Sequence, residues 1–182
     1  KSTISSAAAV TSLQKGTHTE GDAISLLSEL DGVEYTKNEE YFENKFIKGF
    51  PDIISGEGKL KCITDVKCPT DMPSFLLKAN HFKEPQYEWQ MQGYMWLTGA
   101  MYGEIAYCLV NTPQHIIDLQ KAKIINNARL AGTLSDKTYQ AAENLQQSLT
   151  YDDIPINKRV IRYKVHFSKD KVERIKKAVL MA

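Results

Sequence analysis

The sequence has no stretch long and apolar enough to cross a membrane, and no sign of a second domain. A transmembrane helix needs about 18 or more consecutive apolar residues, and no such run occurs among the 182 residues. Residues 1–10 lack the long apolar core of a secretory signal peptide. No internal repeat or low-complexity linker interrupts the chain. We therefore expect residues 1–182 to form a single domain with a sizeable core and no membrane association.

Cysteine is scarce, and its positions exclude two kinds of stabilisation. Cys62, Cys68 and Cys108 are odd in number and lack the spacing of metal ligands. The sequence therefore predicts neither a disulfide framework nor a cysteine-bound metal cluster. Cys62 and Cys108 lie in apolar runs, where buried thiols are the simplest interpretation. Since nothing requires an oxidising compartment, we expect a cytoplasmic protein.

Net charge is nearly absent, at +1, so the overall balance does not indicate a nucleic-acid partner. The distribution is uneven, however, because residues 158–177 contain nine Lys or Arg and only two acidic residues. A local excess of seven positive charges on an otherwise acidic chain can be a binding surface for phosphates. The alternative is a solvated face of an amphipathic helix, the commoner meaning of such a run.

Residues 49–67 contain the most informative pattern, which is typical of a β-hairpin. Residues 50–55 and 60–67 are rich in Ile, Val, Thr and Phe, and the glycine-rich residues 56–59 lie between them. If Ser55 pairs with Leu60, Asp52 lies opposite Ile63. Because side chains alternate along a strand, Asp52, Asp65 and Lys67 then share one face. A shift of one residue in the register would separate them.

Two neighbouring carboxylates and a lysine on one face suit a metal site. Carboxylates this close repel unless a proton or cation lies between them, and Mg²⁺ prefers oxygen ligands of this kind. The ammonium of Lys67 would then lie beside a water or a substrate phosphate, an arrangement suited to phosphodiester hydrolysis. The alternative is a solvated strand with ordinary surface charges, and the hairpin alone does not decide between them.

The remaining pattern predicts helices and strands in alternation. A helix over 20–30 has Thr19 as its candidate cap, and a strong helix over 85–100 carries two aromatic stripes with the amide of Gln90 in one of them. Further helices are expected at 118–132, 135–150 and 169–181, and further strands at 33–36, 40–48, 104–110 and 159–167. This order predicts an α/β (α+β) fold, a mixed central β-sheet flanked by helices.

Several motifs resemble one nuclease superfamily. Pro51-Asp52, followed by Asp65-Val66-Lys67, resembles the PD-(D/E)XK signature of the restriction-endonuclease-like nucleases. Gly16, Glu20 and Ala23 have the spacing of the first motif of the lambda exonuclease and YqaJ-like viral recombinase branch. Gln90-x-x-x-Tyr94 is similar to the Q-x-x-x-Y motif that follows the active-site lysine in that branch. The joint occurrence in this order is more specific than any one motif.

The resemblance implies a fold and a set of roles. It implies a restriction-endonuclease-like core and a site in which Asp52, Asp65, Glu20 and the carbonyl of Val66 bind Mg²⁺, for which Mn²⁺ can substitute. Lys67 would orient or deprotonate a water. Gln90 and Tyr94, one turn apart on a helix, would hold the phosphate, the lysine or DNA. The branch that carries an iron–sulfur cluster is not expected, because the cysteines do not cluster.

The resemblance also implies a substrate and partners. Members of this branch digest one strand of linear duplex DNA from its 5′ end, often as a trimeric ring, with a single-strand-annealing protein as partner in phage recombination. The expected place is the cytoplasm of a bacterium or a phage-infected host. An endonuclease or a RecB-like repair nuclease with the same core is one alternative. A catalytically silent DNA-binding module is the other.

Overall fold

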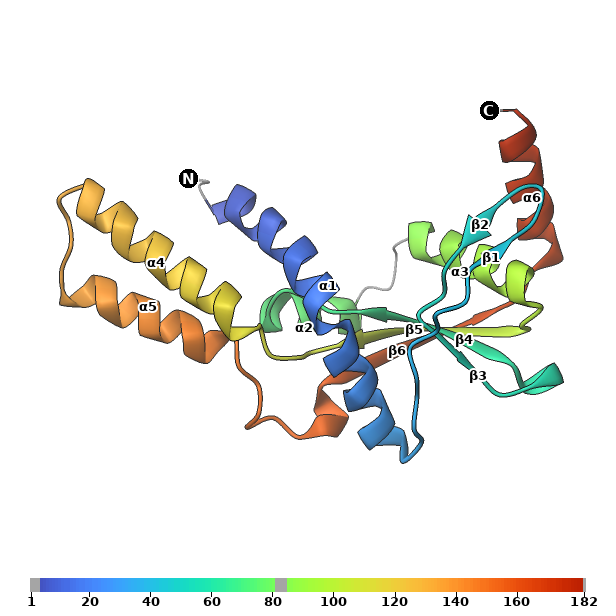
Figure 1. The fold of residues 1–182 in the computed structure, drawn as a ribbon, viewed down its shortest axis with the longest axis horizontal. Helices are drawn as coiled ribbons and strands as arrows, with labels where there is room; N and C mark the ends of the chain where they lie inside the picture. The colour runs from blue at the N-terminus through green and yellow to red at the C-terminus, as the bar shows by residue number, and fades with distance from the viewer. Residues whose placement is uncertain (1–3, 81–84, 182) are drawn as a thin grey trace.

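The structure is a computed structural model that describes residues 4–80 and 85–181, with side chains for residue 15 and from residue 18 onward except residue 80. Its centre is a four-stranded mixed sheet in the order β3-β4-β5-β6 (Figure 1). The strands are β3 (Ile53–Ser55), β4 (Cys62–Lys67), β5 (Tyr102–Cys108) and β6 (Val160–His166). β4 and β5 are parallel, whereas both edge strands pair antiparallel to their neighbours. The fold class predicted from the sequence is thus confirmed.

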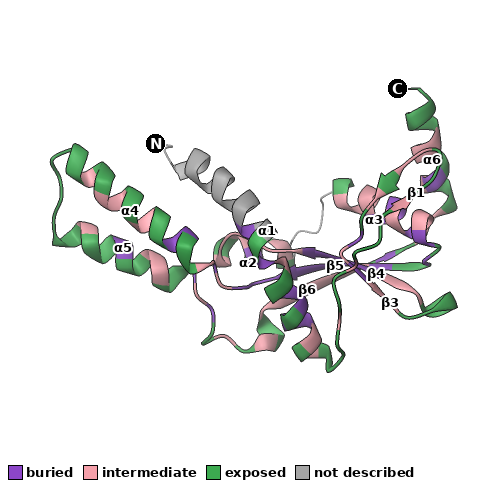
Figure 2. Cartoon of the chain, in the orientation of Figure 1, coloured by how far each residue is buried: buried purple, intermediate pink, exposed green. Residues whose placement is uncertain are grey.

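Helices cover both faces of this sheet. On one face, α1 (Ile4–Asp31) packs the buried side chains of Ala23, Ile24 and Leu27 against Val66 and Ala106. On the other face, α2 (Met72–Asn80) and α3 (Pro85–Thr98) contribute Phe75, Met91 and Met95 to the core around Ile63 and Ile105. Figure 2 shows the buried residues concentrated in these strands and in the helix faces turned toward them.

Three further helices lie outside this sandwich. α6 (Lys169–Leu180) packs on α3, and Ser168 caps it by accepting a hydrogen bond from the Lys171 N–H. α4 (Gln114–Leu130) and α5 (Asp136–Ser148) pack on each other and project away from the sheet (Figure 1). Among the residues described, none of the helices combines the length and apolarity that a bilayer crossing needs.

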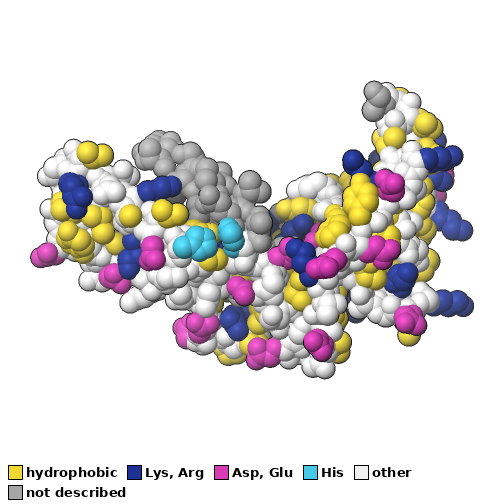
Figure 3. All heavy atoms as spheres, in the orientation of Figure 1, with side chains coloured by type: hydrophobic (Ala, Val, Ile, Leu, Met, Phe, Trp, Pro, Cys, Tyr) yellow, Lys and Arg dark blue, Asp and Glu magenta, His cyan; other side chains and the backbone are white. Residues whose placement is uncertain are grey.

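Lys and Arg side chains gather over α6 at the right-hand edge of the molecule in Figure 3. The same helix contains most of the basic residues that the sequence places in its tail. Within it, Lys176 pairs with Glu173 on the same helix and Lys171 pairs with Glu88 of α3. Part of the basic charge of α6 is therefore neutralised locally. The other basic residues of the tail precede α6, and among them Arg162 of β6 pairs with Asp31 and Glu104.

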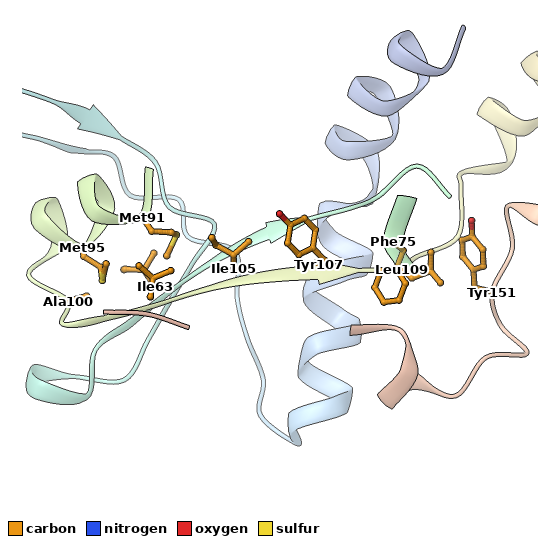
Figure 4. Close-up of a cluster of buried hydrophobic side chains, with 10 residues drawn as sticks. Ile63, Phe75, Met91, Met95, Ala100, Ile105, Tyr107, Leu109 and Tyr151 are labelled. Atoms are coloured by element: carbon orange, nitrogen blue, oxygen red, sulfur yellow. The ribbon is translucent and has the colours of Figure 1, made fainter. Parts of the chain in front are cut away.

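The larger buried cluster runs along the face that carries α2 and α3. Figure 4 shows Ile63, Met91 and Met95 meeting at one end of β4 and β5, and Phe75, Leu109 and Tyr151 at the other end. Leu109 and Tyr151 follow β5 and α5, so this cluster also ties the base of the α4–α5 hairpin to the sheet. Burial of this apolar surface fixes α3 over β4, where the predicted site residues lie.

Several element boundaries differ from those predicted. α1 begins at Ile4 rather than near residue 20, so Thr19 is not an N-cap; its hydroxyl donates to the Lys15 carbonyl within the helix. Residues 33–36 form no strand, and the predicted strand over 40–48 is a short ribbon of β1 (Phe42–Glu43) and β2 (Lys48–Gly49). Asn44 causes the break, because its side chain accepts hydrogen bonds from the Phe46 and Ile47 amides and forms a turn.

Candidate active site

Asp52 and Asp65 meet where β3 begins opposite β4. The observed register pairs Ile53 with Thr64 and Ser55 with Cys62. Extended by one residue, this register places Asp52 opposite Asp65, on the face covered by α3. Residues opposite each other in an antiparallel pair have closely spaced side chains.

The predicted register was wrong by two residues, yet it predicted the correct face. Ser55 pairs with Cys62 rather than Leu60, because Gly58–Leu60 form a 3-10 turn that delays the start of β4. Asp52 therefore lies opposite Asp65 and not Ile63. Since side chains repeat every two residues along a strand, a shift of two keeps Asp52, Asp65 and Lys67 on one face.

Pro51 ends the β3–β4 ladder and leaves polar groups of Val66 for other partners. Extending the register places Pro51 opposite Val66, and proline has no N–H to donate to the Val66 carbonyl. The Val66 N–H instead donates to Asp52 Oδ2 at 2.7 Å. The N–H and C=O of a paired strand residue point to the same neighbouring strand, so we expect the Val66 carbonyl to point to the β3 side of β4.

Asp65 and Lys67 form an ion pair in which the carboxylate is buried and the lysine is partly exposed. Lys67 Nζ lies 2.7 Å from Asp65 Oδ2, and the Asp65 side chain is 2% exposed. This ammonium is the close partner of Oδ2, which accepts no hydrogen bond of good geometry among the described residues. Lys67 Nζ also lies 4.7 Å from the centre of the Tyr87 ring of α3, so a carboxylate and an aromatic face hold the ammonium between them.

The electrostatics of the two carboxylates favour a bound cation. Burial, and then the neighbouring charge of Asp65, raise the pKa of Asp52 to about 7, against the hydrogen bond from Val66. Burial also raises the pKa of Asp65, with Lys67 opposing. Two neighbouring carboxylates with raised pKa values repel each other when both are ionised, and Asp65 Oδ2 accepts no hydrogen bond of good geometry among the described residues. A hard divalent ion bound between them would relieve this repulsion.

Glu20 approaches from the opposite layer and is paired elsewhere. It lies in the middle of α1, so it is not a charge at a helix start, and its Oε2 lies 2.8 Å from Lys37 Nζ. Its charge still contributes to the raised pKa values of Asp52 and Asp65. No group of three or more His, Cys, Asp or Glu side chains is arranged to hold a metal ion in the described part of the chain. The structure thus brings Asp52 and Asp65 together, and Glu20 stays a predicted ligand.

Gln90 and Tyr94 interact as their spacing on α3 predicts. Gln90 Nε2 donates to the Tyr94 hydroxyl at 2.9 Å. Burial raises the pKa of Tyr94, and the charges of Asp65 and Asp52 add to this effect. The phenol therefore keeps its proton and lies within the field of the two carboxylates.

The buried face of α3 differs from the predicted aromatic stripes. Met91, Gln92 and Met95 are fully buried, whereas the predicted stripe residues Tyr87, Gln90 and Tyr94 are half-buried. The Gln92 amide bridges the start of α6 by donating to the His166 carbonyl and accepting from the Ser168 N–H. Gln92, and not Gln90, is therefore the buried amide that its neighbours satisfy.

Sequence reasoning missed three residues around the site. Tyr87 lies under Lys67, Lys37 pairs with Glu20, and Asn38 donates to the backbone carbonyls of Asp52 and Pro51. Tyr87 lies one turn before Gln90 on the same helix, so the i, i+3 spacing was an available signal. Lys37 and Asn38 belong to an irregular segment, where no periodic pattern exists.

Comparison with known proteins identifies structural neighbours. A phage-related exonuclease from Haemophilus somnus matches with a TM-score of 0.69 and 28% identity, over 93% of this chain and 68% of that protein. An alkaline exonuclease from Laribacter hongkongensis matches with a TM-score of 0.60 and 16% identity, over 93% of this chain and 66% of that protein. A structure of the latter with dAMP matches with a TM-score of 0.58.

The chain thus spans about two thirds of the length of these exonucleases. At 16% identity the second match concerns the fold, whereas the first, at 28%, also supports a nuclease function on DNA. No protein-family model and no curated protein matches the sequence.

Proposed function

We propose that this chain is a divalent-metal-dependent exonuclease. Its structural neighbours are consistent with the lambda exonuclease and YqaJ-like branch of the PD-(D/E)XK nucleases. The chain would hydrolyse phosphodiester bonds of linear duplex DNA in the 5′-to-3′ direction. The observation that carries the proposal is the pairing of the partly buried Asp52 with the buried Asp65, with Lys67 2.7 Å from Asp65 and the Gln90–Tyr94 pair on the covering helix.

Asp52, Asp65 and the Val66 carbonyl would hold the ion, Mg²⁺ or Mn²⁺, and Glu20 would complete the site. When bound, the ion supplies Lewis acidity that activates water and stabilises charge on the phosphate. The donor set is made of oxygens only, which suits these hard cations better than softer metals.

Lys67 would orient the attacking water and stabilise negative charge, rather than act as a base. Burial opposes its charge, but the carboxylate of Asp65 more than compensates, so the pKa of Lys67 lies above its usual value. Nζ therefore keeps its proton at neutral pH and acts as a donor. Its position between Asp65 and the Tyr87 ring limits where that donor can point.

Gln90 and Tyr94 would bind the DNA backbone next to the scissile bond. The Tyr94 oxygen accepts from Gln90, so its own O–H is directed elsewhere and can donate to a phosphate oxygen. The same proposal includes a single nuclease domain, a trimeric ring and a single-strand-annealing partner, all of which rest on the family resemblance.

The test compares linear and closed-circular duplex DNA of one sequence, each incubated with the protein and Mg²⁺. We expect the linear DNA to shorten from its ends, the circle to stay intact, and EDTA to stop the reaction. Phosphorothioate linkages at the 5′ ends should protect the linear DNA, whereas the same linkages at the 3′ ends should not. Nicking or linearisation of the circle would instead indicate an endonuclease.

A further inference from the structure

Lys37 is held at the edge of the candidate active site by its neighbours in the chain. Tyr35 fixes one side, since its N–H donates to Ser28 Oγ and its hydroxyl donates to Asp31 Oδ2, both on α1. Asn38 fixes the other side. Its N–H donates to the Asp52 carbonyl at 2.8 Å, and its side-chain amide donates to the Pro51 carbonyl at 3.0 Å.

This anchoring places the Lys37 side chain beside Glu20, the predicted site carboxylate on α1. Lys37 Nζ lies 2.8 Å from Glu20 Oε2, and the two side chains are 51% and 23% exposed. Hydrogen bonding to Glu20 raises the pKa of Lys37, with a smaller contribution from the charge of Asp52. The ammonium is therefore in the field of two of the groups expected to hold the metal.

The charges around the site are divided between two lysines. Lys67 neutralises Asp65 and has 25% of its side chain exposed, whereas Lys37 neutralises Glu20 and has 51% exposed. The close contact with Lys37 reduces the negative charge that Glu20 offers to a metal ion. Oε2 itself cannot touch both cations, because two cations in contact with one oxygen repel each other. A half-exposed lysine can leave such a pair at little cost, since exposed ion pairs are weak.

We propose that Lys37 is the resident counter-ion of Glu20 and competes with a divalent cation for its carboxylate, so that Lys37 weakens metal binding at this site. The inference rests on the proposed function, because it assumes that Glu20 is a ligand of the metal. It assigns a role to an irregular segment that otherwise only connects α1 to β1. Lys37 acts on the affinity for the metal, and not on the reaction itself.

The test measures Mn²⁺ affinity by isothermal titration calorimetry on the whole protein without DNA. Lys37→Gln should bind Mn²⁺ roughly three- to tenfold more tightly than the wild type, since it removes both the competing pair and a nearby positive charge. Lys37→Arg keeps the charge and should bind no more tightly than the wild type. Lys59→Gln, an exposed lysine in the 3-10 turn at the far end of the hairpin, should bind like the wild type because salt screens distant charges.

A second comparison tests whether the effect acts through Glu20. In a Glu20→Gln background, Lys37→Gln should give a clearly smaller gain in affinity, because only the removal of a nearby positive charge remains. Wild-type affinity in Lys37→Gln, or an equal gain in both backgrounds, would overturn the inference while leaving the metal-dependent nuclease in place. A wild-type protein that binds no Mn²⁺ would overturn both.

Discussion

Asp52 is a site carboxylate that keeps its proton to a higher pH than an ordinary aspartate. Burial and the charge of Asp65 raise its pKa to about 7, whereas an unfolded chain would have a value near 3.8. Between these two values the folded protein binds more protons than the unfolded one, so the free energy of unfolding falls as the pH rises. Metal-free protein should therefore lose stability between about pH 4 and pH 7, and metal binding, which needs the carboxylate, should strengthen over the same range.

Asp52→Asn should remove this dependence. In EDTA, we expect the variant to be more stable than the wild type at pH 8, with a difference that shrinks toward pH 5, because the asparagine carries no charge to bury. Its side-chain oxygen can still accept from the Val66 N–H. Urea denaturation at both pH values measures the effect, with the exposed Asp153→Asn as the control. A difference of the same size at both pH values would contradict the assignment.

The sequence predicted the common face of Asp52, Asp65 and Lys67 despite a wrong register. Side chains on a strand return to the same face every two residues, so a register error of two does not change the face. The error arose because the turn is two residues longer than expected. Lys37 could not be predicted, since its position follows from hydrogen bonds of Tyr35 and Asn38 that no local pattern encodes.

At the scale of elements, the turn between β3 and β4 fixes the register on which the site depends. Gly56 has φ +68°, and a Cβ at this position would lie 2.5 Å from the Leu60 carbonyl oxygen. Gly58 also has a positive φ, +53°, but a Cβ there would meet nothing within 4 Å. Alanine substitutions at the two positions therefore distinguish two contributions to the loss of stability. Gly58 tests the unfavourable φ alone, and Gly56 tests the φ together with the clash against Leu60.

Gly56→Ala should destabilise the protein by about 2–4 kcal/mol, from a strained φ and a backbone clash. Gly58→Ala should cost only about 1–2 kcal/mol, from its φ alone. Urea denaturation of both variants measures the difference. Equal losses of stability would show that the contact with Leu60 does not hold the turn.

Periodicity predicted where α3 lies but not which face it buries. The aromatic residues of both stripes remain half-buried, because α3 packs on the sheet through Met91 and Met95 while α6 covers part of its other side. A single sequence cannot rank neighbouring apolar stripes when a helix contacts two partners. The length of α1 was also missed, since its first half lacks a strong apolar periodicity.

At the scale of the molecule, the family resemblance and the fold class are confirmed, whereas the surroundings of the core were not predictable. The helix expected at 118–132 exists as α4, but its apolar residues Leu119 and Leu130 are 58% and 87% exposed. The helix buries Ile116 and Ile117 at its base instead. The α4–α5 hairpin leaves the sheet at that base (Figure 1), so amphipathicity alone could not indicate what the rest of the helix contacts.

The measurement that tests the central claim most directly compares wild type and Asp65→Asn on linear duplex DNA with Mg²⁺, with and without EDTA. Wild-type protein should degrade the DNA only without EDTA. Asp65→Asn keeps the shape of the side chain but removes the charge that the cation and Lys67 need, so the rate should fall by at least about 100-fold. DNA binding, measured by fluorescence anisotropy, should stay nearly unchanged. A folded Asp65→Asn protein that cleaves at a rate close to the wild type, or cleavage that persists in EDTA, would contradict the account.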